Sequence, residues 1–154
     1  MSEIRFYHLQ RAALEDALPK MLELAYDRGW RVLVAAGSPE RVEALTSHLW
    51  TYRPDGFLPH GSAKDGDAAE QPIYLTAGDD NPNGADTLFL CDGAARADVG
   101  SFRLVCEMFD GNDELAVGAA RERWKGYKEA GHKLVYFQQS DGGKWEEKAR
   151  SDPA

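Results

Sequence analysis

Cationic and aromatic side chains gather in one short segment, RERWKGYKEAG, at residues 121–131. If this segment is helical and advances about 100° per residue, one sector of the helix carries five side chains: Val117, Arg121, Trp124, Lys125 and Lys128. A guanidinium fork, an ammonium group and a flat ring suit a ligand that combines an apolar ring with a carboxylate, as an acidic chain terminus does. The segment is therefore the first candidate for a binding site.

An internal explanation of the same pattern stays open. Arg121 and Lys125 are like charges four residues apart, which disfavours a helix slightly unless something negative compensates. Lys125 could pair with Glu122 or Glu129. Arg121 could pair with acidic residues elsewhere, and Trp124 could lie in the core. Charge-laced helix faces are common, so the pattern alone does not decide between internal pairing and a binding site.

Patterns typical of catalytic, nucleotide and metal sites do not occur. The histidines are scattered, with no i,i+4 pair that would bind a metal: His8, His48, His60 and His132. Three aspartates that follow predicted strands could hold Mg²⁺, but turn positions explain them better: Asp79, Asp80 and Asp92. Neither G-x-G-x-x-G nor G-x-x-x-x-G-K-[ST] is present. We therefore expect no catalytic residues, no metal ion and no cofactor.

Composition and charge exclude some classes of function. The 154 residues carry a formal net charge of −8, which argues against broad, non-specific nucleic-acid binding because phosphate neutralisation needs a basic footprint. No stretch approaches the ~20 apolar residues of a membrane span, and MSEIRFYHL lacks the layout of a secretory signal. We expect a cytoplasmic protein. Cys91 and Cys106 lie in apolar segments, so we expect buried free thiols.

Helices and strands alternate along the chain. Five apolar segments are typical of strands covered on both faces of a sheet: residues 4–9, 31–37, 72–78, 87–93 and 133–139. Helical patterns occupy residues 12–28, the segment that opens with Ser38 and Pro39, and residues 98–109 and 113–130. This order predicts an α/β fold with a mainly parallel or mixed sheet of five or more strands. Because the linker 78–86 is too short for a helical crossover, the strands it joins are either antiparallel or not neighbours.

Two motifs resemble a known family. RERWKGYKEAG resembles the R-E-R-Y-K-x-Y-R-x-A-G segment of the chi subunit of bacterial DNA polymerase III. LWTYRPDGFLPHG, followed by QPIYL, is similar to that family's L-W-x-F-x-P-H segment and its next strand, and FYHL near the start also matches. The resemblance spans residues 4–138. It implies a single Rossmann-like, three-layer domain over residues 1–140, and we expect residues 141–154 to form a flexible tail.

The resemblance also implies partners. Chi proteins are non-catalytic members of the clamp-loader assembly that bind the acidic C-terminal tail of single-stranded DNA-binding protein and dock on the psi subunit by another face. The tail-binding arginine, aromatic residue and lysine of the motif fall on Arg121, Trp124 and Lys125, with Trp in place of Tyr. Val117 stands where a further basic residue is expected, and Lys128 lies nearby. The psi-type interface maps to five residues: Trp50, Phe57, Leu58, Pro59 and His60.

We therefore expect an accessory subunit of the polymerase complex that has no catalytic residues, contacts DNA only indirectly and contacts no membrane. Two alternatives stay open: a small nucleotide-dependent enzyme on a Rossmann-like scaffold, and an adaptor for another acidic peptide. At the second face, Trp50 and Phe57 could instead be ordinary core residues, with Pro59 in an irregular loop.

Overall fold

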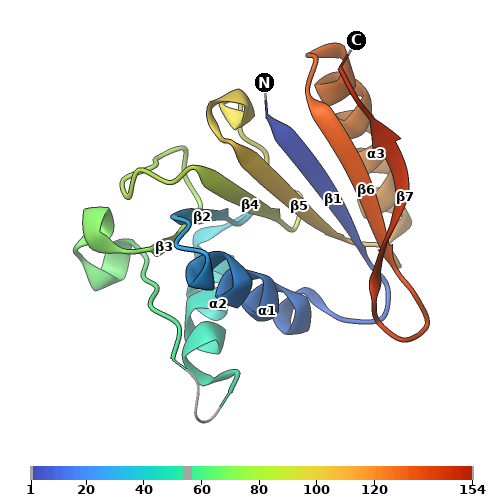
Figure 1. The fold of residues 1–154 in the computed structure, drawn as a ribbon. Helices are drawn as coiled ribbons and strands as arrows, with labels where there is room; N and C mark the ends of the chain where they lie inside the picture. Colours follow the sequence, from blue (N-terminus) through green and yellow to red (C-terminus); the bar gives the residue numbers. More distant parts are fainter. Residues whose placement is uncertain (1, 54–56, 154) are drawn as a thin grey trace.

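A seven-stranded sheet organises the chain (Figure 1). The computed structural model describes residues 2–53 and 57–153. In spatial order the strands are β3 (Ile73–Thr76), β2 (Val32–Ala35), β4 (Thr87–Cys91), β5 (Leu104–Asp110), β1 (Glu3–Leu9), β6 (Lys133–Gln139) and β7 (Trp145–Ser151). The strand pairs from β3 to β6 are parallel, and β6 pairs with β7 in the antiparallel sense. The predicted α/β fold with a mainly parallel, mixed sheet is confirmed.

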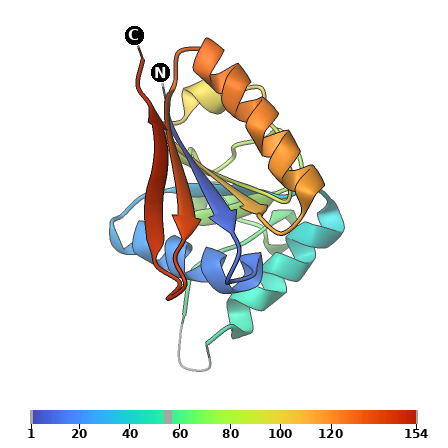
Figure 2. The ribbon, with the colours of Figure 1, turned by 90° about the vertical axis from the view of Figure 1, so that its right-hand side faces the viewer.

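Helices cover both faces of the sheet and produce three layers (Figure 2). On one face lie α1 (Leu14–Asp27) and α2 (Pro39–Thr51), and on the other lies α3 (Glu114–Glu129). Successive residues of a strand point to opposite faces. Val34 therefore joins the core beneath α1 and α2, whereas its neighbour Leu33 joins the core on the α3 side. Burial on both faces explains why these strands are apolar nearly throughout.

Short polar signals set the helix ends. The Ser38 hydroxyl accepts a hydrogen bond of 3.1 Å from the backbone N–H of Arg41, and Pro39 is the first helical residue of α2, as predicted. Asp113 caps α3 in the same way. Gly29 follows α1 with a φ of +76°, a conformation that glycine adopts without strain. The α2 and α3 helices therefore begin close to where the sequence places them.

The helix predicted at residues 98–109 is wrong. A short 3₁₀ turn occupies Val99–Ser101, and β5 follows in the middle of the sheet, between β4 and β1. A strand in that position is buried on both faces, so its sequence LVCEMF is apolar on both sides. Periodicity does not separate such a run from a buried helix. Glu107 is the polar residue of this run, and it forms an ion pair with Arg123 of α3.

The linker between β3 and β4 behaves as its length requires. The two strands run parallel but are not neighbours, because β2 lies between them. This is one of the two arrangements that the sequence allows. Arg96 holds the linker in place: its guanidinium donates to the carbonyl oxygens of Gly78, Asp79 and Asp80 at 3.3, 2.9 and 3.0 Å.

The C-terminal segment 141–154, where the sequence predicts a flexible tail, contains β7. This strand covers the edge of β6, which would otherwise present unpaired backbone groups. The Trp145 ring packs edge-on against Tyr7, with 5.1 Å between ring centroids. A bulge between Tyr136 and Phe137 interrupts the pairing. The β6–β7 pair is therefore part of the sheet, and it forms one wall of the groove described below.

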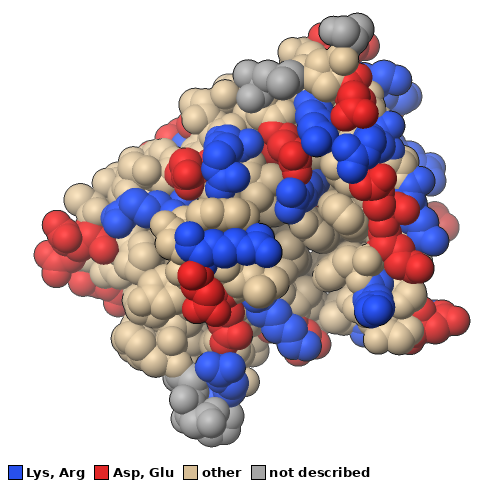
Figure 3. Space-filling view, viewed as in Figure 1, with Lys and Arg blue, Asp and Glu red and all other residues tan. Residues whose placement is uncertain are grey.

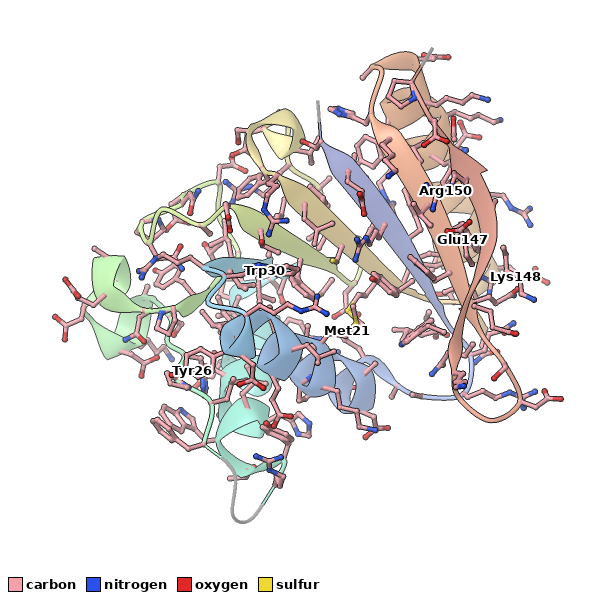
Figure 4. The ribbon with its side chains drawn as sticks, in the orientation of Figure 1. Met21, Tyr26, Trp30, Glu147, Lys148 and Arg150 are labelled. Carbon is pink, nitrogen blue, oxygen red and sulfur yellow. The ribbon has the colours of Figure 1, made fainter. Side chains whose placement is uncertain are left out.

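Long charged side chains cover the face of β1, β6 and β7 that is turned towards the viewer in Figure 1. Figure 3 shows Lys and Arg interspersed with Asp and Glu over this face. Glu147, Lys148 and Arg150 project from β7 (Figure 4), and an Arg150 nitrogen lies 2.8 Å from a Glu147 oxygen. Beneath them Val135 is buried. The apolar stems of these side chains shield the strand while their charged ends stay in water.

Candidate functional site

A groove of about 530 Å³ lies between α3 and the β6–β7 pair. It is lined by eight residues: Gly118, Ala120, Arg121, Glu122, Trp124 and Lys125 of α3, Tyr136 of β6 and Ala149 of β7. Arg121, Trp124 and Lys125, which the helical spacing places in one sector, therefore lie together in the groove. It combines two cationic groups and the carboxylate of Glu122 with aromatic and small apolar side chains.

Trp124 forms a fixed apolar wall of this groove. One turn earlier, the small buried side chain of Ala120 brings α3 close to the sheet. The half-buried indole then meets Phe6 and Tyr136 edge-on, at 5.4 and 6.0 Å between ring centroids. Contacts of this geometry are favourable beyond the area that they bury. Trp124 is therefore both a core residue and a groove residue, so neither of the two sequence interpretations describes it alone.

Arg121 differs from the other arginines of the chain. Each of the other ten makes an ion pair, a hydrogen bond or a cation–π contact. Arg121 is exposed on α3 and has no such contact with any residue that the structure describes. Internal pairing of Arg121 thus has no support within residues 2–53 and 57–153. Its planar fork of donors faces solvent and is available to a ligand.

Lys125 is only loosely engaged. Its Nζ lies 3.5 Å from an Oε1 of Glu122, and both side chains are exposed. Pairing of Lys125 with Glu122 is one of the internal contacts that the sequence predicts. Exposed pairs of this kind contribute about 0–1 kcal/mol, so a negatively charged ligand can compete for Lys125.

Two of the five expected groove residues lie outside the lining. Val117 is half-buried and packs against the core beneath α3. Lys128 is exposed towards the end of the helix. Val117 therefore supports the helix from below, and Lys128 contributes charge near the groove without lining it.

Sequence reasoning missed the residues that the strands contribute. Tyr136 lies two residues after Leu134 on β6, so the alternation of a strand places both on the α3 side of the sheet. That signal was available once β6 was recognised. Ala149 pairs with Tyr136 next to the bulge in the β6–β7 pair. No sequence signal gives this register, because it depends on a strand that composition does not suggest.

A histidine supports the base of the groove. The Tyr136 hydroxyl lies 2.5 Å from Nδ1 of His8, the penultimate residue of β1. Burial lowers the pKa of His8, and the positive charge of Arg121 acts in the same direction. Burial raises the pKa of Tyr136, so its hydroxyl keeps its proton at neutral pH. Tyr136 can therefore donate a hydrogen bond at the base of the groove.

A second candidate surface surrounds two exposed aromatic residues. Trp50 and Phe57 are 48% and 71% exposed, and their ring centroids are 5.9 Å apart. They are not ordinary core residues. A cavity of about 430 Å³ between α2 and β3 reaches Trp50 from one side. A cluster of exposed large apolar side chains is a common feature of protein–protein contact sites.

The three other residues expected at this surface lie below it. Leu58 and His60 are buried, and Pro59 is half-buried. The two ring nitrogens of His60 lie 2.7 and 3.0 Å from the carbonyl oxygens of Leu58 and Thr46. Its ring is 4.3 Å from that of Trp50. His60 therefore supports Trp50 from below.

The aspartates considered for Mg²⁺ have structural contacts. Asp80 accepts a hydrogen bond of 2.5 Å from the Thr76 hydroxyl, and Asp92 forms an ion pair with Arg41 at 2.5 Å. Asp92 has a φ of +54°, which occurs at tight turns. Within the described part of the chain, no group of three or more His, Cys, Asp or Glu side chains is placed to hold a metal ion. These contacts favour the turn interpretation.

The cysteines are buried free thiols, as predicted. Burial raises the pKa of both thiols, that of Cys106 to about 12. Both therefore stay protonated and unreactive at neutral pH. Among the helices described, none combines the length and the apolar character that a membrane span requires.

Comparison with known proteins gives the family. A family model described as "DNA polymerase III chi subunit, HolC" matches residues 1–135, most of the chain and all of α3. The chain belongs to this family. The resemblance inferred from the two motifs is confirmed. The match ends one residue before Tyr136, so the two strand residues that line the groove, Tyr136 and Ala149, lie beyond it.

Individual relatives are also named as chi subunits. The chain is 28% identical to the DNA polymerase III subunit chi of Pseudomonas aeruginosa over 138 residues, which cover 87% of this chain and 94% of that protein. It is 27% identical to the subunit chi of Escherichia coli over 142 residues, 87% of this chain and 96% of that protein. A probable subunit chi of Rickettsia prowazekii is 32% identical over 90 residues, 58% of this chain and 54% of that protein.

Proposed function

We propose that this chain is a cytoplasmic, non-catalytic accessory subunit of the DNA polymerase III complex. It binds the acidic C-terminal tail of single-stranded DNA-binding protein and links that protein to the clamp-loader assembly, so that it contacts DNA only indirectly. One observation carries the proposal. Arg121 is the arginine without a partner among the described residues, and it stands on a groove with an aromatic wall.

The groove offers one group for each feature of such a tail. An aromatic side chain at the end of the tail fits between Trp124 and Ala149. The terminal carboxylate matches the planar fork of Arg121. The acidic side chains that precede it meet Lys125, with Lys128 further along the helix. The local cluster thus attracts an anionic peptide even though the whole chain is acidic.

The exposed Trp50–Phe57 pair is the proposed contact for a psi-type or other clamp-loader subunit. It lies at the end of α2 and in the segment that follows. The groove beside α3 is built from other elements, so both partners can bind at once. In this arrangement the chain bridges two proteins.

The two alternatives make different predictions. A nucleotide-dependent enzyme would bind nucleotides saturably, and no observation on this structure favours that activity. An adaptor for another acidic peptide would use the same groove. Peptide sequence separates the adaptor from the proposed function, since a scrambled tail has the same charge but lacks the terminal aromatic residue.

Arg121→Ala tests the proposal most directly. A charge-assisted hydrogen bond contributes about 1.5–3 kcal/mol, so a synthetic tail peptide should bind about 10- to 150-fold more weakly to the variant. Calorimetric titration measures this. Arg11→Ala is the matched control, because it removes the same group from an exposed ion pair with Asp141. It should leave tail affinity unchanged.

Melting curves complete the experiment. Because Arg121 is exposed and unpaired within the described residues, its loss should change the melting temperature little. Tail affinity should also fall as salt rises without vanishing, since the ring contact is not screened. If Arg121→Ala lowered thermal stability and left tail affinity unchanged, Arg121 would have a structural role and the proposed site would be wrong.

A further inference from the structure

The base of the α3 groove contains a hydrogen-bonded pair for which the proposed tail contacts give no role. Tyr136 lines the groove together with Arg121, and its hydroxyl lies 2.5 Å from Nδ1 of His8. Both residues come from the sheet, on the neighbouring strands β6 and β1. Their positions are therefore fixed independently of α3.

His8 is tightly enclosed. It is 8% exposed, and its ring lies 5.3 Å from Phe109 and 5.8 Å from Tyr136, edge-on to both. On its other side is the backbone of Gly111, where an added Cβ would come within 2.0 Å of Nε2. Nε2 has no hydrogen-bond partner among the described residues. The imidazole therefore has no room to turn away, and Nδ1 stays directed at the Tyr136 hydroxyl.

Four neighbouring elements present polar groups to His8. Tyr136 faces it from β6, the charge of Arg121 acts on it from α3, that of Asp110 from the end of β5, and the Gly111 backbone from the loop that follows. Burial disfavours the protonated imidazole, as does the charge of Arg121, whereas the Gly111 backbone and Asp110 favour it. A carboxylate bound at Arg121 would offset the positive charge and so favour protonation of His8.

The geometry permits a chain of two hydrogen bonds. When Nδ1 of His8 carries a proton, it donates to the Tyr136 oxygen, and the phenol proton is then free for another acceptor. The groove beside Arg121 is where that acceptor would sit. A carboxylate has two oxygens and can accept from a guanidinium and a phenol together. No proton transfer is needed, because each group keeps its own proton.

We propose that Tyr136 is a second donor to the terminal carboxylate of the bound peptide, and that His8 is the positioning residue that orients the Tyr136 hydroxyl. The inference rests on the proposed function and names the chemical group that the groove selects, a free α-carboxylate beside an aromatic ring. Since a carboxylate bound at Arg121 offsets its positive charge and favours protonation of His8, binding takes up a proton. The affinity therefore rises as pH falls from 8 to about 5.5, a range in which an α-carboxylate stays ionised.

A double-mutant cycle tests the donor. The probes are an acidic peptide that ends in phenylalanine with a free carboxylate, and the same peptide as its C-terminal amide. Tyr136→Phe keeps the ring and removes the hydroxyl, and it should weaken binding of the free acid about tenfold. For the amide the loss should be below about twofold. Equal losses for both peptides would show that Tyr136 is only a wall and would overturn the inference.

A pH series tests His8. His8→Asn keeps a donor near the position of Nδ1 but does not titrate, so the rise in affinity at low pH should disappear. His48→Asn, on α2, is the matched control and should keep the parent profile. A parent chain whose affinity for the free acid does not change between pH 8 and 5.5 would refute the role of His8. This measurement uses the parent chain alone, so it does not depend on whether a variant folds.

The outcomes separate the inference from the function on which it rests. If the parent chain binds neither peptide, the proposed function fails and the carboxylate assignment fails with it. If the parent binds both peptides equally well, an acidic peptide is bound but its terminus is not recognised. In that case the proposed function stands and the inference is wrong.

Discussion

We expect the buried Glu107 to make the stability of this protein fall as pH rises towards neutral. Its side chain is 2% exposed beneath α3, where one carboxylate oxygen bonds to the Arg123 guanidinium. The other oxygen has no hydrogen-bond partner among the described residues. Burial raises the pKa of Glu107 from 4.5 to about 7, although Arg123 acts in the opposite direction. Burial of the charged form thus outweighs the ion pair.

The direction in which the free energy of unfolding changes with pH follows from the two pKa values of Glu107. In the unfolded chain Glu107 loses its proton near pH 4.5, whereas in the folded chain it holds the proton until about pH 7. Between these values folding takes up a proton, so the free energy of unfolding falls as pH rises through this window. Since each pKa unit corresponds to about 1.36 kcal/mol, the rise from 4.5 to about 7 corresponds to about 3 kcal/mol.

Glu107→Gln removes the titration and keeps the shape. We expect the variant to match the parent near pH 4.5 and to be more stable by about 2–3 kcal/mol at pH 8. Urea unfolding of both chains at a series of pH values measures the difference. Glu129→Gln, at an exposed site on the same helix, should show no such difference. A Gln variant less stable than the parent at pH 8 would mean that the ion pair with Arg123 outweighs burial, and it would refute this reasoning.

Two further pairs of substitutions test other parts of the structure. Gly111→Ala puts a Cβ 1.9 Å from the enclosed His8 ring and should lower the free energy of unfolding by about 1–3 kcal/mol. Gly126→Ala adds a Cβ in open space on α3 and should raise the free energy of unfolding by about 0.5–1 kcal/mol. Urea unfolding measures both. Phe57→Ala should weaken capture of a psi-type partner and leave tail binding and melting temperature unchanged. Leu24→Ala removes another exposed large apolar side chain, 57% exposed against 71% for Phe57, from α1 and should affect neither partner. Equal losses from both variants would mean that Phe57 is not part of the interface.

Much of the fold follows from local sequence. A run such as Val32–Ala35 is apolar at every position because α1 and α2 cover one face of the sheet and the α3-side core covers the other. Ser38 and Pro39 mark the start of α2 through a hydrogen bond and a fixed φ, two effects that need no tertiary contact. Elements set by such local signals are where the sequence predicts them.

The two strands that the sequence did not predict depend on distant partners. The β5 strand is buried between β4 and β1, and burial on both faces removes the alternation that would distinguish it from a helix. The β7 strand reads WEEKARS, with charges at most positions. Its backbone pairs with β6, and its charged side chains lie in water. Neither environment leaves a local pattern.

For the same reason, the sequence predicts only the residues that α3 contributes to the candidate site. Helical spacing brings Arg121, Trp124 and Lys125 together, since residues three or four apart share a helix face. Tyr136 and Ala149 reach the groove through strand pairing, and His8, which contacts the Tyr136 hydroxyl, lies on β1, more than a hundred residues earlier in the chain. Spacing rules do not connect segments so far apart.

Pairing, rather than net charge, reveals where this acidic chain can receive an anion. Arg41 is held between Glu15 and Asp92, and Arg123 is held by Glu107, so neither can bind a ligand without abandoning a carboxylate. Arg121 can bind an anion without breaking an ion pair, because it has no contact of this kind among the described residues. A free guanidinium beside a rigid ring gives a local attraction that a net charge of −8 does not cancel at contact distance, since exposed charges further away than about 10 Å are screened by salt.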